Sequence, residues 1–240
     1  MKNNIIEFQE YRIKRSDDQK GIFSETCKER RQISQKLWKR ESQKYTSKYV
    51  SRDRKRKIEH IVSRLLRGND MEAARMVDIA SFVKSQGFLV QKAHLPAGTI
   101  GFLVVNDMEY IEGTNTHKWI VIDQEFANAE NEIEMELKQS RFVTAHVYGH
   151  YILHKKDNTT YACKNTGKSD SFEDLEADYF ARSILMPRTA FQMVNDMLNR
   201  LRWKETDAVY ELKAEYLSDI FKVPQKEVQR RLEDLLEISN

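Results

Sequence analysis

Two histidines spaced one helical turn apart are the residues of this chain best suited to binding a metal ion. His146 and His150 lie four positions apart in the stretch RFVTAHVYGHYILH, residues 141–154. In a helix this spacing places both imidazoles on one face. Neutral imidazole is a good zinc ligand, but a zinc site needs at least one more ligand from elsewhere. Because such pairs also occur by chance, the third ligand decides whether this one is a site.

Acidic residues about twenty positions further along supply candidates for that ligand. The stretch FEDLEADYFARSILMP, residues 172–187, carries Asp174 and Asp178 four positions apart. On a second helix one carboxylate could bind the ion while the other accepts the outer N–H of a histidine and fixes its tautomer. Glu173 and Glu176 offer alternatives in a different register. We therefore expect a site formed where two helices converge.

These two segments resemble the ImmA/IrrE-type metallopeptidases, whose pattern is roughly rFtxAHExGHyxLH followed by ExxAN/DxFAxxLLMP. The matching residues are Arg141-Phe142, Ala145-His146, Gly149-His150-Tyr151, Leu153-His154, Ala177-Asp178, Phe180-Ala181 and Leu185-Met186-Pro187. The likeness extends from about Ile58 to Phe191. It implies a zincin-like domain and a zinc-dependent endopeptidase that typically cleaves a repressor protein, in systems that regulate mobile elements, prophages or stress genes.

The resemblance also assigns roles to individual residues. His146, His150 and Asp174 take the ligand positions around one zinc ion. Asp178 and His154 take supporting positions behind the ligands.

The chain departs from the family pattern at two of its key positions. Val147 stands where the family has a glutamate, which serves as the general base and acid of peptide hydrolysis. Valine can do neither, and such proton transfer is worth roughly 10²–10⁴-fold in rate. Asp174 replaces a glutamate ligand with a side chain one methylene shorter. Glu173 is the nearest substitute base by sequence.

Three functional hypotheses follow from these departures. The first is a catalytically impaired pseudo-peptidase that binds a repressor-type regulatory protein. The second is an active zinc endopeptidase with a substitute base, cleaving a transcriptional repressor. The third is a nucleic-acid-binding regulator that uses a basic N-terminal arm.

The basic arm is defined by the charge distribution along the chain. Residues 1–57 carry 18 lysines and arginines against 8 acids, although the whole chain has a formal charge of only +3. The densest cluster is Arg52, Arg54, Lys55, Arg56 and Lys57. These residues could contact nucleic acid, whereas a solvated helix would carry the same pattern.

Periodicity and turn residues outline the remaining elements. We expect helices over 58–66, 71–85 with Asp70 as cap, 142–154, 172–185, 190–202, 208–221 and 224–236. Short strands are expected over 88–92, 101–106 and 118–123, and their close spacing favours an antiparallel meander. The fold class is therefore α+β: a helical or flexible arm (1–57), a metallopeptidase-like domain (58–195) and a helical extension (196–240). The last two helices resemble a helix-turn-helix, in which Arg230 and Arg231 could contact phosphate. The acids of the second helix make its charge mixed, which favours a structural or partner-docking role instead.

Composition limits the compartment. The two cysteines, Cys27 and Cys163, are too few and too far apart for a disulfide framework, which favours a reducing compartment. Cys163 is expected in the loop between the two site helices, as a free thiol rather than a ligand. No apolar run approaches the roughly 20 residues of a membrane span. A cytoplasmic location with no membrane contact is therefore expected.

Overall fold

The computed structural model describes residues 49–69, 71, 76–95, 98–105, 117–123, 133–154, 160–164, 171–200 and 207–239. Its contacts divide the chain after Tyr49, and the unit described below is Val50–Asn240. Most of the expected basic arm, with Cys27, lies outside the described residues. None of the helices in the described part of the chain combines the length and apolarity that crossing a membrane requires.

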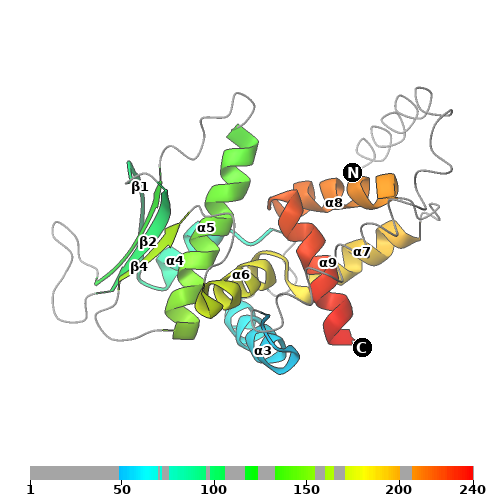
Figure 1. Cartoon of the computed structure of the whole chain (residues 1–240), viewed down its shortest axis with the longest axis horizontal. Helices are drawn as coiled ribbons and strands as arrows, with labels where there is room; N and C mark the ends of the chain where they lie inside the picture. The colour runs from blue at the N-terminus through cyan, green and yellow to red at the C-terminus, as the bar shows by residue number, and fades with distance from the viewer. Residues whose placement is uncertain are drawn as a thin grey trace. The chain divides into compact units, whose positions relative to one another are not determined.

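Seven helices and four strands make up the described part of this unit, which is a mixed α+β fold (Figure 1). In chain order they are α3 (Arg52–Arg67), α4 (Ile79–Ser85), β1 (Leu89–Ala93), β2 (Thr99–Val105), β3 (Lys118–Asp123), α5 (Ile133–His154), β4 (Thr160–Lys164), α6 (Phe172–Leu185), α7 (Arg188–Asn199), α8 (Asp207–Phe221) and α9 (Gln225–Ser239).

The sheet is mixed rather than an antiparallel meander. Its strand order is β1-β3-β2-β4; β1 runs parallel to β3, whereas β2 runs antiparallel to both β3 and β4. The expected meander is therefore wrong, because β3 lies between β1 and β2. The five-residue link from β1 to β2 can span the roughly 10 Å across one intervening strand. Within it, the backbone N–H of Leu95 donates to the Asp123 carboxylate at the end of β3.

One strand was not expected at all. Cys163, predicted in a loop, lies in β4 at the sheet edge beside β2.

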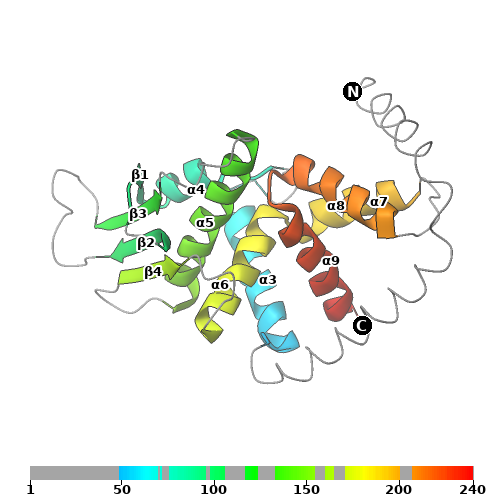
Figure 2. The same ribbon diagram turned by 45° about the horizontal axis from the view of Figure 1, so that its top comes forward.

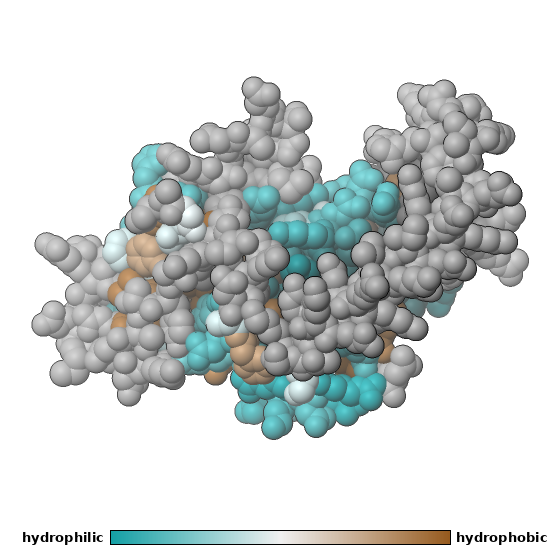
Figure 3. All heavy atoms as spheres, viewed as in Figure 1, coloured by the Kyte–Doolittle hydropathy of each residue, from teal (hydrophilic) through white to brown (hydrophobic). Residues whose placement is uncertain are grey.

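Successive side chains along each strand point to opposite faces of the sheet, which gives it an inner and an outer face. Leu103, Val105, Ile120 and Ile122 are buried and point to the side that α5 covers. Gly101 of β2 makes this packing close, since a Cβ there would lie 2.9 Å from the Val143 side chain of α5. On the surface, hydrophobic residues reach solvent over the sheet while α3 presents hydrophilic ones (Figure 3).

Helix α5 is the central element of the unit. It contacts β2, β3 and β4 on one side and packs extensively on α6 on the other, as Figure 2 shows. Residues around its whole circumference are buried, including Val143, Ala145, Val147 and Tyr148. The helix begins at Ile133, earlier than the predicted Phe142. The site residues therefore belong to a long helix that is packed on both sides.

Helix α3 packs against both α6 and α9. Ser51 caps it by accepting a hydrogen bond from the Arg54 backbone N–H, and Ile58, Val62 and Leu66 form its buried stripe. The basic cluster 52–57 is thus the first turn and a half of an ordered helix, not a tail. The next helix also differs from expectation: α4 begins at Ile79 with Asp78 as its cap, rather than at Met71.

The C-terminal helices α8 and α9 are joined by the three residues 222–224. Lys222 there adopts a left-handed conformation, φ 51°, which lets the chain reverse. Helix α9 packs on α3 and α6, and Arg231 is fully buried beside Glu59 of α3. The phosphate contact considered for Arg231 is excluded, because its guanidinium is enclosed by protein.

Candidate metal centre

Helix α5 carries both histidines on the side that faces α6. Their ring centroids lie 4.8 Å apart, and the two Nε2 atoms are 3.1 Å apart. His150 is almost fully buried, with 4% of its side chain exposed, and His146 is only slightly more open. The predicted spacing thus brings the two ring nitrogens to one point.

Helix α6 supplies the carboxylate that completes the group. Oδ1 of Asp174 lies 3.3 Å from His150 Nε2, and the candidate ligand atoms of Asp174, His146 and His150 all lie within 4.8 Å of one another. Asp174 is also part of a capping box, in which it and Ser171 exchange side-chain hydrogen bonds with each other's backbone N–H. Asp174 therefore reaches the histidines although it is one methylene shorter than glutamate. The capping box at the start of α6 orients its carboxylate.

The approach of the two helices depends on Gly149, between the histidines. A Cβ at this position would lie 3.0 Å from the Phe180 ring and 3.3 Å from the Ala177 backbone of α6. Both distances are shorter than ordinary van der Waals contact. A glycine here lets α6 approach closely enough for its acids to meet the histidines of α5.

Each histidine is oriented by a further hydrogen bond on its outer side. His146 donates from Nδ1 to Asp178, at 2.8 Å. His154 donates from Nε2 to Glu176, at 2.8 Å, and its Nδ1 lies 3.3 Å from His150 Nδ1. Glu176 in turn accepts two hydrogen bonds from Arg54 of α3. Asp178 and His154 thus occupy the supporting positions that the sequence resemblance implied.

These hydrogen bonds determine which ring nitrogens have lone pairs. A carboxylate only accepts, so neutral His146 has its proton on Nδ1 and neutral His154 has its proton on Nε2. His154 Nδ1 is then an acceptor, 3.3 Å from His150 Nδ1. With a cation between the two Nε2 atoms, neutral His150 would carry its proton on Nδ1, so that both Nε2 lone pairs would be available to the ion.

The spacing of the three candidate ligand atoms can be compared with what a zinc ion requires. Tetrahedral zinc with ligands at roughly 2.0–2.2 Å separates neighbouring ligand atoms by roughly 3.3 Å. The two separations measured from His150 Nε2, 3.1 Å to His146 and 3.3 Å to Asp174, agree with that value, and all three candidate ligand atoms lie within 4.8 Å of one another. Since about a third of the Asp174 side chain is exposed, the group is also open to solvent on one side.

The surroundings of His150 keep its imidazole neutral, which is the form that binds a cation. Burial, together with the neighbouring His146, lowers the pKa of His150 to about 3. Burial would raise the pKa of Glu176, but hydrogen bonds from Arg54 and His154 keep it below the ordinary value. At neutral pH, His150 is therefore a neutral imidazole and Glu176 is a carboxylate.

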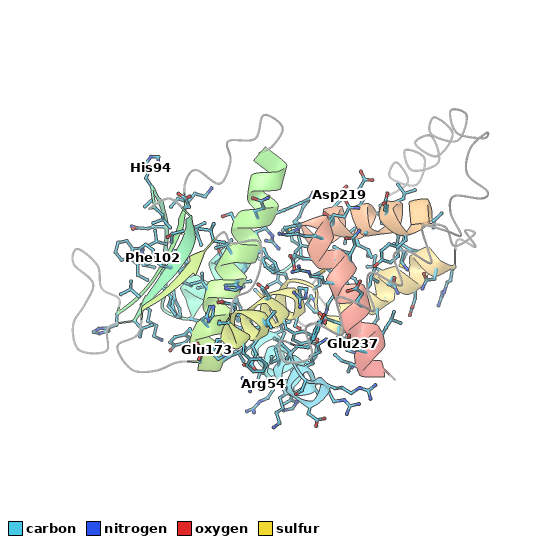
Figure 4. The ribbon with its side chains drawn as sticks, in the orientation of Figure 1. Arg54, His94, Phe102, Glu173, Asp219 and Glu237 are labelled. Atoms are coloured by element: carbon cyan, nitrogen blue, oxygen red, sulfur yellow. The ribbon has the colours of Figure 1, made fainter. Side chains whose placement is uncertain are left out.

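The general-base position carries no titratable group. Val147 is fully buried within the hydrophobic core cluster. Glu173 lies in the first turn of α6 (Figure 4), and the metal-binding group found among the described residues does not include it. Glu176, the other alternative by register, is engaged by Arg54 and His154.

The neighbouring tyrosines pack within the structure. Tyr148 is buried edge-on against Phe82 and Phe88, and Tyr151 stacks on Tyr148. Lys118 lies over the Tyr151 ring. These contacts give both tyrosines a packing role.

The five residues of the basic cluster face in different directions. Arg54 binds Glu176, and buried Lys55 binds Asp234 of α9 at 2.7 Å. Arg52, Arg56 and Lys57 are exposed, and Arg52 donates to a backbone carbonyl of α9. Contact of this cluster with nucleic acid stays a prediction, and only its exposed members could take part. The sequence reasoning did not foresee the inward role of Arg54, whose partner is 122 positions away.

The fold and site together comprise a mixed α+β arrangement: a mixed sheet, a helix carrying two histidines, and a second helix supplying an acid. Residues 131–233 match the model of a peptidase family described as the IrrE N-terminal-like domain. The match confirms that this stretch resembles the ImmA/IrrE family. The match starts well after Ile58 and continues into α9. No curated protein is similar enough to count as a match.

Proposed function

We propose that this chain binds one zinc ion through His146, His150 and Asp174 and is a pseudo-peptidase that binds a repressor-type regulatory protein. The observation that carries the proposal is an intact set of three converging ligand atoms beside a buried valine at the general-base position. When bound, zinc would supply Lewis acidity toward a carbonyl or water.

The surrounding residues support binding better than hydrolysis. Asp178 and His154 orient the histidine rings, and the acids nearest them are already engaged. A proton shuttle would need a carboxylate able to reach both water and the leaving amine. The alternative, an active endopeptidase that uses Glu173, draws no support from a described contact. The partner and a cytoplasmic location are supported by the family resemblance and the cysteine content.

A cleavage assay tests the catalytic half of the proposal. The zinc-loaded chain, His146→Ala and Val147→Glu are each incubated with an unfolded protein substrate, and new termini are counted by mass spectrometry. The wild-type chain should produce no more new termini than His146→Ala. Val147→Glu, compared at equal folded fraction by circular dichroism, should show a gain of up to roughly 10²–10⁴-fold. Zinc-dependent cleavage by wild type that His146→Ala abolishes would establish an active enzyme instead.

The proposed binding of a repressor-type protein needs a separate measurement. Purified repressor-type proteins are titrated with the zinc-loaded chain, and both binding and the length of the repressor are followed. The proposal expects a complex with intact repressor. Cleaved repressor, or no binding to any of them, would contradict it.

A further inference from the structure

A continuous series of hydrogen bonds runs from α3 to the metal-binding group. The Arg54 guanidinium donates from Nε and Nη2 to the two carboxylate oxygens of Glu176, each at 2.6 Å. Oε2 of Glu176 also accepts from His154 Nε2, at 2.8 Å. His154 Nδ1 lies 3.3 Å from Nδ1 of the ligand His150. The series joins four side chains from three helices and ends at the ring of His150, with Arg54 on α3 below α6 in Figure 4.

We propose that Arg54 is a positioning residue of the metal centre, acting through Glu176 and His154 to fix the tautomer and orientation of His150. The proposal rests on the metal site proposed above and makes α3, which lies outside the family match, a component of that site.

The geometry of the Arg54 contact favours this role over a generic ion pair. A planar guanidinium that contacts both oxygens fixes the plane of the carboxylate, whereas a single contact leaves it free to rotate. Only 4% of the Glu176 side chain is exposed, so water cannot readily replace the guanidinium. Without Arg54, the Glu176 carboxylate, which accepts the hydrogen bond from His154 Nε2, would be free to rotate.

Packing of α3 on α6 does not itself require this contact. Glu59 of α3 accepts hydrogen bonds from Tyr179 and Ser183 of α6, and Lys55 binds Asp234 of α9. The helix therefore keeps other attachments when Arg54 is changed, so that its effect on the metal can be measured in a folded protein.

The experiment measures Co²⁺ affinity of the full chain by its visible absorption, for wild type, Arg54→Met, Arg54→Lys, Glu176→Gln and Arg56→Met. Arg56→Met is the matched control, because it removes a guanidinium from the same helix. The Arg56 side chain is half exposed, and it forms an ion pair with Asp53, at 3.8 Å. Glu176→Gln keeps the size of the side chain and serves as the second test if Arg54→Met folds poorly. In chelator-treated protein, long-range proton–nitrogen NMR reads the tautomer of His154.

We expect Arg54→Met and Glu176→Gln to weaken Co²⁺ binding by roughly tenfold, the lower end of the range for residues behind metal ligands. Arg54→Lys should lose less Co²⁺ affinity than Arg54→Met, and Arg56→Met should bind Co²⁺ as tightly as wild type. The share of His154 carrying its proton on Nδ1 should rise in Arg54→Met. Equal affinity and equal tautomer in Arg54→Met and Arg56→Met would overturn the positioning role while leaving the metal site intact. A wild type that binds no Co²⁺ would overturn both proposals.

Discussion

Gly149 of α5 lies directly against Ala177 of α6, so that a methyl group on the glycine would stand 3.3 Å from both the Cα atom and the carbonyl oxygen of the alanine. The next residue after each is a site residue, His150 and Asp178. The missing side chain therefore sets the distance over which the acids of α6 reach the histidines of α5.

Replacing Gly149 with alanine should weaken metal binding. Alanine favours a helix over glycine by roughly 1 kcal/mol, but the new methyl group meets backbone atoms that can move only with α6. Overpacking of this kind costs roughly 1–3 kcal/mol, so the net change in unfolding free energy should be zero to about 2 kcal/mol of destabilisation. Because α6 must shift outward, Co²⁺ affinity should fall by about tenfold.

Gly68→Ala is the matched control for that change. Gly68 ends α3, and a Cβ there would make only ordinary contacts, the nearest at 3.4 Å. Its metal affinity should equal that of wild type. If Gly149→Ala binds Co²⁺ as tightly as Gly68→Ala, the helix approach does not control the site.

Asp178 should contribute to metal affinity without binding the metal. It accepts the Nδ1 proton of His146 at 2.8 Å, which leaves the Nε2 lone pair for the ion. Asp178→Ala removes the acceptor and should weaken Co²⁺ binding roughly 10–100-fold. Asp178→Asn keeps a carbonyl oxygen and should lose much less. Equal losses in the two variants would mean that charge, rather than the hydrogen bond, is the quantity that matters.

The site was largely predictable because its parts are local in sequence. His146 with His150, and Asp174 with Asp178, each lie four positions apart, and a helix necessarily places such residues on one face. The family pattern then paired the two helices. Arg54 could not be found this way, since its partner is 122 positions distant and a single sequence carries no signal of that pairing.

The fold was predictable to a similar depth. The strands β1, β2 and β3 appear close to their expected bounds, because alternating and β-branched residues act over short range. Strand order depends on long-range packing instead. The spacing between β1 and β2 limits how far apart they lie but does not exclude β3 from the gap between them. For the same reason the edge strand β4 and the burial of Arg231 were missed.

Zinc should stabilise the folded chain in proportion to the concentration of free metal. Only the folded state brings His146, His150 and Asp174 together, so one zinc per chain is expected by elemental analysis after purification without chelator. At 100 times the dissociation constant, binding adds roughly 2.7 kcal/mol to the unfolding free energy. Chelator should lower the melting temperature of wild type but not of His146→Ala. An equal shift in both proteins would place the zinc elsewhere.

Acid should destabilise the metal-free protein through Glu59, which joins α3 to α6 and α9. Burial raises the pKa of this carboxyl, but Arg231 and hydrogen bonds from Tyr179 and Ser183 outweigh burial and hold the pKa below its ordinary value. A carboxyl with a depressed folded pKa binds its proton less readily than in the unfolded chain. Its contribution is therefore complete above the unfolded pKa of roughly 4.3 and is lost as pH falls through the folded pKa.

The variant Glu59→Gln isolates that contribution. Near pH 7 it should lower the unfolding free energy by roughly 3–5 kcal/mol, because Arg231 keeps a buried charge without its partner. Between pH 5 and pH 3, in chelator, its stability should fall less steeply than that of wild type. Asp53→Asn, which changes an exposed acid on the same helix, should follow the wild-type curve. Denaturant titrations at each pH measure all three, and parallel slopes for wild type and Glu59→Gln would show that Glu59 does not bind a proton on acid unfolding.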